Sequence, residues 1–232
     1  MTAVFAHRGC TEGGIRENTV EAFAEARRLG ADGVELDVRL TKDGALAVHH
    51  DAAVPGVGVI PELGAAELPD HVPLLADVLA VCDGMTVNVE IKNAPADPGW
   101  DAGEVVAAVT AEAIELAGWT DRVLVSSFQP ATLRAVQAAD ERLALGALWG
   151  FGTDPGPGLE EAAAAGFEAV HPFVLAVTPE LVERAHALGL SVNAWTVNEP
   201  HDLRAMVELG VDTVITDVLR EALAIAGARA GA

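Results

Sequence analysis

The sequence predicts a single α/β domain folded as a (β/α)8 TIM barrel, with a β-hairpin excursion after the second strand and a short insert. Three observations support this fold. Short apolar strands without strict polar alternation recur along the chain, which is typical of parallel strands buried on both faces. Most of them follow an alanine-rich helix that ends in glycine, a residue that closes helices in the left-handed conformation. Eight such units fit into 232 residues, as this barrel requires.

The eight parallel strands are expected at residues 3–7, 33–37, 86–91, 122–127, 143–148, 168–171, 190–195 and 211–216. The helices that follow them are expected at residues 18–29, 74–82, 102–117, 130–139, 158–165, 179–188, 199–209 and 217–228. Asn18 is expected to cap the first helix, with Glu21 reaching back to it. Thr178 and Pro179 form a cap and first-turn pair for the sixth. A doubly wound open sheet is the alternative, because local pattern does not show closure.

One segment breaks the alternation of strand and helix. Residues 39–44 follow the second strand and include Asp43-Gly44, and the next apolar run, 45–48, ends in His49-His50-Asp51. Asp-Gly between two extended runs indicates a hairpin. A parallel return would need a crossover of about a dozen residues, which this segment is too short to supply. We therefore expect a return arm that brings His50 over the barrel mouth, followed by a short insert at residues 51–73.

Composition narrows the classes of protein that the chain can represent. The net charge is −21, from 35 acidic and 14 basic side chains, so the surface repels nucleic acids and anionic membranes. Apolar runs stay shorter than a membrane span, and the N-terminus lacks the pattern of a secretory signal. The two cysteines are too few for a disulfide framework. We expect one cytoplasmic domain over residues 1–232, without nucleic acid or stable membrane association; the oligomeric state is not indicated.

Carboxylates gather at the ends of two predicted strands. Glu35 and Asp37 are two residues apart and therefore lie on the same face of one strand, and Glu90 and Lys92 do so on the next. If that face is the barrel interior, three carboxylates and a lysine point into one mouth. Oxygen ligands of this kind suit Mg²⁺ or Ca²⁺. A buried salt-bridge network of Lys92 with Glu90 or Glu35 is the structural alternative.

Two histidines add acid–base chemistry to this end of the barrel. His7 follows the first strand and precedes Arg8, and His50 ends the return arm. Histidine can donate or accept a proton near neutral pH. Arg8 offers a planar fork and Lys92 a point charge to phosphoryl oxygens. An acid, a base, a cation and two positive clamps together indicate phosphoryl transfer.

These residues occur in an ordered set of motifs: His7-Arg8-Gly9, Glu17-Asn18-Thr19, Glu35-Leu36-Asp37, His50-Asp51, Glu90-Ile91-Lys92, Ser127-Phe128, Trp195-Thr196-Val197-Asn198 and Thr216-Asp217. The set resembles the signature of the glycerophosphodiester phosphodiesterases, which are TIM barrels of the phospholipase C-like superfamily. The resemblance extends almost to the C-terminus.

The resemblance implies a role for each matching position. His7 and His50 would be the general acid–base pair, and Glu35, Asp37 and Glu90 would hold Mg²⁺ or Ca²⁺. Substrate-binding residues would be Arg8 and Lys92 at the phosphate and Phe128 and Trp195 at the wall of the alcohol pocket, with Glu17 orienting Arg8. The implied reaction is metal-dependent hydrolysis of a small-molecule glycerophosphodiester to sn-glycerol 3-phosphate and an alcohol.

The chain departs from the family after Asp51. Family members often continue with a leucine, an arginine and a Thr-Thr-Gly stretch, whereas this chain reads Ala52-Ala53-Val54-Pro55-Gly56. Glycerol recognition is therefore left open, and a metal-dependent phosphodiesterase with another substrate is an alternative. An enolase- or aldolase-type lyase would use the carboxylates and Lys92, but it would not need both histidines. A catalytically inactive barrel would be expected to have lost at least one of the matching positions.

Overall fold

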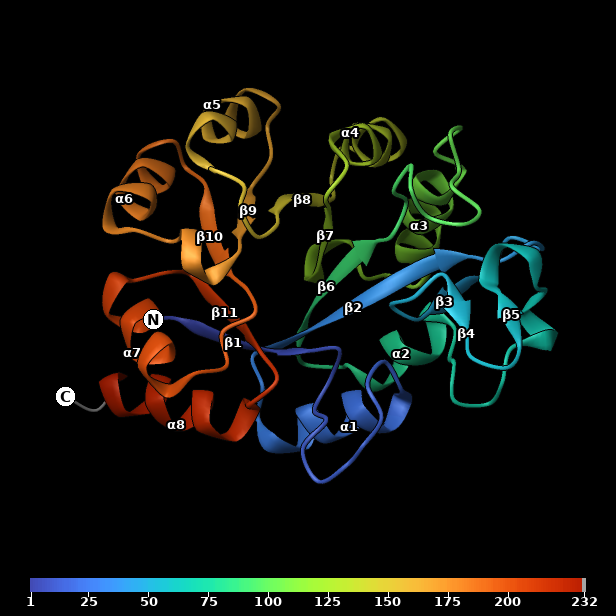
Figure 1. The fold of residues 1–232 in the computed structure, drawn as a ribbon, viewed down its shortest axis with the longest axis horizontal. Helices are drawn as coiled ribbons and strands as arrows, with labels where there is room; N and C mark the ends of the chain where they lie inside the picture. The colour runs from blue at the N-terminus through green and yellow to red at the C-terminus, as the bar shows by residue number, and fades with distance from the viewer. Residues whose placement is uncertain (231–232) are drawn as a thin grey trace.

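The computed structural model describes residues 1–230 and contains a closed ring of eight parallel strands (Figure 1). The ring runs in the order β1, β11, β10, β9, β8, β7, β6 and β2, and β2 pairs with β1 to close it. The strands are β1 (Ala3–His7), β2 (Gly33–Leu40), β6 (Thr86–Ile91), β7 (Val123–Ser127), β8 (Ala144–Trp149), β9 (Ala169–Pro172), β10 (Ser191–Ala194) and β11 (Thr213–Thr216). The predicted barrel is confirmed, and closure rules out the open sheet.

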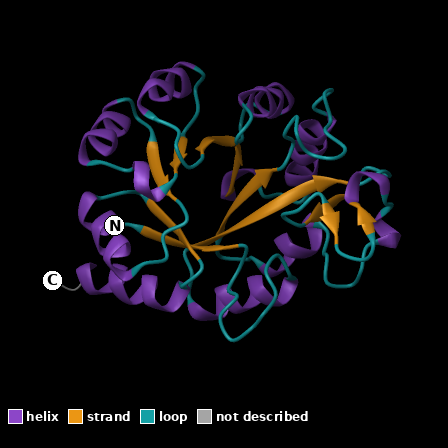
Figure 2. Cartoon of the chain, in the orientation of Figure 1, coloured by secondary structure: helices purple, strands orange, loops and turns teal. Residues whose placement is uncertain are grey.

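Eight α-helices surround the ring of strands (Figures 1 and 2). They are α1 (Val20–Leu29), α2 (Leu75–Val81), α3 (Val105–Leu116), α4 (Pro130–Ala139), α5 (Gly156–Ala164), α6 (Pro179–Ala187), α7 (Pro200–Leu209) and α8 (Leu219–Ala230). Gly30 and Gly210 close α1 and α7 in the left-handed conformation, as predicted. The Thr178 hydroxyl accepts a hydrogen bond from the Leu181 N–H, which confirms the predicted cap of α6.

The predicted cap of α1 is wrong by one residue. The capping residue is Thr19, whose hydroxyl accepts from the Ala22 N–H at 3.2 Å. A capping residue needs extended backbone, which Thr19 has, whereas Asn18 has a positive φ of 54°. The side chain of Asn18 instead donates to Asp37 Oδ2 at 2.8 Å. Asn18 therefore belongs to the barrel interior rather than to the helix start.

The hairpin after the second strand is present as predicted. Strand β2 extends to Leu40, and β3 (Leu46–Val48) returns antiparallel to it, with Val38 opposite Val48. The insert that follows forms β4 (Ala53–Val54), β5 (Gly58–Val59) and two short 3₁₀ helices, η1 (Ile60–Glu62) and η2 (Ala65–Glu67). It buries a small apolar cluster of Ala47, Val54, Ile60 and Val72, beside the barrel (Figure 1). Two further 3₁₀ turns are η3 (Thr120–Arg122) and η4 (Val174–Ala176).

Strand β2 shows how the sequence places carboxylates inside the barrel. Val34, Leu36 and Val38 alternate with Glu35 and Asp37, and all five side chains are buried. The three apolar residues join the main hydrophobic core. The opposite face of the strand, which carries the two acids, therefore points into the barrel. Apolar packing outside the ring holds charged groups in place inside it.

Gly9 lies two residues after β1 and packs closely against the start of α1. Its φ is +82°, and an added Cβ would lie 2.7 Å from the Ala22 Cβ. We expect Gly9→Ala to lower the free energy of unfolding by about 2–3 kcal/mol, measured by urea denaturation, because strain and overlap add. Gly13→Ala is the control, since Gly13 has a similar φ of +80° but open space around it. Its cost should be about 1 kcal/mol, and an equal cost at Gly9 would exclude the packing contribution.

Candidate active site

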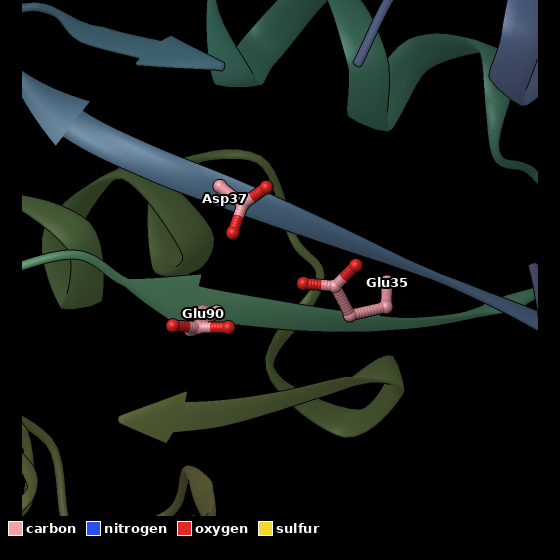
Figure 3. A group of neighbouring side chains, drawn as sticks. All are labelled: Glu35, Asp37 and Glu90. Carbon is pink, nitrogen blue, oxygen red and sulfur yellow. The ribbon is translucent and has the colours of Figure 1, made fainter. Parts of the chain in front are cut away.

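Three carboxylates from β2 and β6 converge at the mouth of the barrel (Figure 3). Asp37 and Glu90 are register partners on the two strands, and Glu35 lies one inward-facing position before Asp37. One oxygen from each residue can be chosen so that all three lie within 4.8 Å of one another. All three side chains are buried. The predicted convergence of these acids is present in the structure.

Two cationic side chains neutralise part of this cluster. Lys92 Nζ lies 2.5 Å from Glu90 Oε1 and 3.1 Å from Asp37 Oδ1, although the directions at these two oxygens are poor for hydrogen bonds. Arg8 Nε lies 3.3 Å from Asp37 Oδ2, and Arg8 Nη1 lies 3.0 Å from Glu17 Oε1. Burial opposes ionisation of Asp37, but the charges of Lys92 and Arg8 outweigh it and lower the pKa of Asp37. An ion pair between Lys92 and Glu90, as the salt-bridge alternative expects, is thus present beside the three-carboxylate cluster.

Glu35 is the carboxylate that these ion pairs leave uncompensated. Its Oε2 accepts the backbone N–H of Arg8 at 3.1 Å, whereas Oε1 is buried and has no hydrogen-bond partner. Burial, followed by repulsion from Asp37, raises the pKa of Glu35 to about 8. A buried carboxylate oxygen that lacks a hydrogen-bond partner and lies among other carboxylate oxygens is a suitable ligand for a hard divalent cation. Glu35, Asp37 and Glu90 are therefore the residues that could hold one.

His7 is held in place by a carboxylate from the other end of the chain. Its Nδ1 lies 2.7 Å from Asp217 Oδ1, and its Nε2 lies 3.8 Å from Glu35 Oε2. Asn198 Nδ2 donates a hydrogen bond to the other carboxylate oxygen, Asp217 Oδ2, at 2.7 Å and so orients Asp217. Burial would lower the pKa of His7, but the Asp217 hydrogen bond and the charges of Glu35 and Asp217 outweigh it and raise the pKa.

His50 stands on the return arm of the hairpin, and about a third of its side chain is exposed. Its Nδ1 lies 2.8 Å from Asp51 Oδ1, and Arg39 Nε donates to its carbonyl oxygen at 2.8 Å. Burial and the positive charge of Lys92 lower the pKa of His50. The two histidines therefore have pKa values shifted in opposite directions. His49 is bonded through Nδ1 to the Asp51 carbonyl.

Asp217 offers a direct test of how His7 is positioned. We expect Asp217→Asn to lower kcat by about 10–100-fold, the usual cost of losing a group that orients a site histidine. Because the lost carboxylate favours the protonated imidazole, the pKa of His7 should fall and its limb of the pH–rate profile should move to lower pH. Asp212→Asn is a matched control, since Asp212 pairs with His186 at 2.8 Å on the protein surface. An unshifted profile in Asp217→Asn would contradict this role.

An aromatic row leads away from the cluster across the barrel mouth. It consists of Phe128, Trp195, Phe173 and Phe151, in spatial order. Lys92 Nζ lies 5.7 Å from the centroid of Phe128, which places the row beside the charged groups. Phe128 and Trp195, both expected at the wall of the alcohol pocket, are in edge-to-face contact at 5.5 Å between centroids.

Sequence reasoning missed several residues of this site. Phe173 and Phe151 belong to no motif in the sequence. Arg39, which links the His50 carbonyl to Asp97, falls in the segment 39–44 that the sequence places after the second strand, and it has no predicted role. Asn18 was assigned to the helix start, and no role was given to Asp217 or Asn198. The signal for Asp217 was available, because Thr216-Asp217 stands at a strand end, where functional groups of this fold gather.

Comparison with known proteins agrees with this geometry. The sequence profile described as the glycerophosphoryl diester phosphodiesterase family matches residues 7–221. The chain belongs to this family. It is 34% identical over 238 residues to a glycerophosphodiester phosphodiesterase of Caldanaerobacter subterraneus, covering 93% of this chain and 94% of that protein. It is also 34% identical over 242 residues to one of Bacillus altitudinis, covering 94% and 95%.

Solved structures of the family share the fold. A glycerophosphodiester phosphodiesterase of Thermotoga maritima superposes with a TM-score of 0.73 at 26% identity, covering 95% of this chain and 96% of that one. A phosphodiesterase of Oleispira antarctica, solved with the product sn-glycerol-3-phosphate, gives a TM-score of 0.86 at 24% identity, covering 97% and 96%. Phosphoric diester hydrolysis is thus the reaction class of this family member, which sets the lyase alternative aside. Within residues 1–230, no helix has the length and apolar character needed to cross a bilayer.

Proposed function

We propose that this enzyme hydrolyses glycerophosphodiesters to sn-glycerol 3-phosphate and an alcohol, with His7 and His50 as the acid–base pair and a divalent cation at Glu35, Asp37 and Glu90. The observation that carries the proposal is the state of the two histidines. Each has Nδ1 engaged with an aspartate, Asp217 or Asp51, which leaves Nε2 to exchange a proton with the substrate.

Proton transfer follows from the opposite pKa shifts of these histidines. The raised pKa makes His7 hold a proton more tightly than an ordinary histidine, and the lowered pKa makes His50 hold one less tightly. These directions suit His7 as the proton donor and His50 as the acceptor, the arrangement that general acid–base catalysis requires. The acceptor takes a proton from the attacking oxygen, and the donor gives one to the departing alkoxide.

Phosphate binding is assigned to Arg8 and Lys92. Both cations already lie against Asp37, at 3.3 and 3.1 Å, so their charges are fixed at the mouth before substrate arrives. Glu17 holds the far side of the Arg8 guanidinium. Glu35, Asp37 and Glu90 would hold the divalent cation, which would supply further positive charge to stabilise the phosphoryl group. Pre-oriented charges of this kind stabilise a transition state without reorganisation.

The direct test is turnover of a panel of glycerophosphodiesters, with release of glycerol 3-phosphate followed by a coupled dehydrogenase assay. Bis(p-nitrophenyl) phosphate reports phosphodiesterase chemistry without glycerol. Hydrolysis of the aryl diester alone would point to a non-glycerol substrate, and hydrolysis of neither would refute the proposal.

We expect little discrimination among small hydrophilic head groups. The short insert at residues 51–73 lacks the arginine and threonines common after the His-Asp motif, and the aromatic row offers no side-chain donor for alcohol hydroxyls. Strong discrimination needs groups that bond the distinguishing hydroxyls. Values of kcat/KM for choline, ethanolamine and glycerol esters should therefore lie within about tenfold, or ~1.4 kcal/mol. A thousandfold preference would reveal a polar contact that the insert and the loop at 152–158 acquire on binding.

A further inference from the structure

Arg39 connects the return arm of the hairpin to a loop that follows the next strand of the barrel. It shares its face of β2 with Asp37, two residues before it, and only 6% of the residue is exposed. Its Nε donates to the His50 carbonyl at 2.8 Å, and its Nη1 lies 2.9 Å from Asp97 Oδ2. Asp97 belongs to the loop at residues 92–104, which joins β6 to α3 (Figure 1).

The hairpin leaves His50 just beyond the end of its strand pairing. Strand β3 ends at Val48, and the His49 N–H donates to the Asp37 carbonyl at 3.0 Å. His50 is the next residue, and the hydrogen bond from Arg39 Nε holds its carbonyl oxygen. Because two side-chain torsions alone separate the imidazole from the backbone, the place of the ring depends on where this peptide is held.

The loop at residues 92–104 holds Asp97 through hydrogen bonds of its own. Asn93 is buried at the start of the loop, where its Oδ1 accepts the Asp101 N–H at 2.9 Å and its Nδ2 donates to the Asp101 carbonyl at 2.9 Å. Between these residues, the Asp97 N–H donates to the Ala94 carbonyl at 2.9 Å. A loop whose ends are tied together in this way is restricted, so its carboxylate is a defined anchor for the guanidinium.

The same loop begins with Lys92, one of the two residues assigned to the phosphate. The Lys92 N–H donates to the Val38 carbonyl at 3.1 Å, directly before Arg39 in the chain. The bridge from His50 through Arg39 to Asp97 therefore joins the proton acceptor to the segment that carries a phosphate-binding residue. The separation of these two groups matters for the rate, because attack requires the reacting atoms to be closely placed and aligned.

Stability alone is a weak reason for an arginine at this position. The attraction inside a buried ion pair is offset by the hydration that both groups lose, and apolar residues of similar volume often replace such a pair without loss of stability. Arginine instead donates in fixed directions from a planar fork, which suits a bridge between two acceptors. We propose that Arg39, anchored by Asp97, is a positioning residue that sets the place of His50 relative to the phosphate. This inference rests on the proposed function, in which His50 is the proton acceptor.

The test measures kcat and KM separately for glycerophosphocholine hydrolysis, by choline release. We expect Arg39→Ala to lower kcat by about 10–100-fold, because a small misplacement of a reacting group can cost about 10²-fold. KM should stay within about threefold of wild type, since Arg8 and Lys92 remain at the phosphate. Asp97→Ala removes only the anchor and should lower kcat by about 3–10-fold. Arg39→Lys keeps the charge but not the fork, so its kcat should stay at least about fivefold below wild type.

The decisive measurement is the double variant Arg39→Ala/His50→Ala. If Arg39 acts through His50, the double variant should lie within about twofold of His50→Ala alone. Unfolding temperatures establish that each variant is folded, and Asp97→Ala and Arg39→Lys, each combined with His50→Ala, carry the same test where Arg39→Ala does not fold. Asp83→Ala is the matched control, because Asp83 pairs with Arg122 Nη1 at 3.0 Å before β6 and β7, at the opposite end of the barrel, and both constants should stay unchanged.

The outcomes separate this inference from the proposed function. Without hydrolysis of glycerophosphocholine, or with His50→Ala as active as wild type, the proposed function fails first. An impaired His50→Ala beside wild-type kcat in Arg39→Ala and Asp97→Ala overturns the positioning role alone. Losses that multiply in the double variant, or a raised KM with kcat intact, would mean that Arg39 acts independently of His50 and likewise overturn it. Full activity in Arg39→Lys would show that charge suffices, which would overturn the bridge.

Discussion

Replacing either His7 or His50 by alanine is expected to lower kcat by about 10²–10⁴, the usual loss when a positioned proton-transfer group is removed. Each histidine has one ring nitrogen fixed by an aspartate, and alanine removes the nitrogen that would face the substrate. The fold should survive both changes. His50 lies on the hairpin arm at the surface, and His7 is at the end of β1, beyond its pairing with β11.

His49→Ala and His186→Ala are the matched controls for this experiment. His49 contacts the Asp51 carbonyl through Nδ1, and His186 of α6 pairs with Asp212. Each substitution therefore removes a comparable contact without removing a proposed proton-transfer group. Both should stay within several-fold of wild type in a steady-state assay. If His49→Ala abolishes activity while His50→Ala keeps it, the assignment of the return arm is off by one residue.

The double change His7→Ala/His50→Ala gives a further check. Groups that act together in one transition state are strongly non-additive, so the double variant should be little worse than the poorer single variant. Losses that multiply would mean that the histidines act in separate steps.

The parts of this site that the sequence predicted are those fixed by local periodicity. Glu35 and Asp37 share a face because strand side chains alternate, and Asp43-Gly44 forces the hairpin that carries His50. The predicted cap of α1 is wrong because Asn18 and Thr19 both favour helix starts. The hydrogen bond that draws the Asn18 side chain to the buried Asp37 carboxylate depends on the folded barrel, so the sequence does not reveal it.

The aromatic row could not be predicted in the same way. Phe128, Phe151, Phe173 and Trp195 follow four different strands, and their contacts exist only because the barrel closes. The partnership of His7 with Asp217 likewise joins β1 to the residue after β11, which meet only in the closed ring. Contacts of this kind depend on topology, so spacing along the chain carries no information about them.

Removing divalent cations is expected to abolish turnover, and added Mg²⁺, Ca²⁺ or Mn²⁺ to restore it. The cluster holds three buried carboxylates, whereas Arg8 and Lys92 share Asp37 as a partner and Arg8 also pairs with Glu17. Glu35 Oε1 remains without a partner. A divalent ion would compensate this charge and use that oxygen as a ligand. Full activity in excess chelator, with the protein shown to be metal-free by elemental analysis, would exclude the metal assignment.

Glu35→Gln separates a metal ligand from a structural acid by a measurement that does not depend on activity. In wild type, added cation should raise the unfolding temperature, because a ligand of the folded state stabilises it. In Glu35→Gln this rise should shrink together with activity, because a ligand and a charge are lost. Glu115→Gln, on the surface of α3, should respond as wild type does.

Without metal, Glu35→Gln should be the more stable of the two proteins near pH 8. Because the pKa of Glu35 is raised from 4.5 to about 8 in the fold, the folded state binds a proton that the unfolded state releases. The stability of the metal-free wild type should therefore fall as pH rises through this window. Glutamine has no such proton, so Glu35→Gln should lose this slope and exceed wild type in stability near pH 8, while binding cation less well. Equal pH slopes in the two metal-free proteins would show that Glu35 is already ionised and compensated, and would remove the electrostatic reason for a cation at this site.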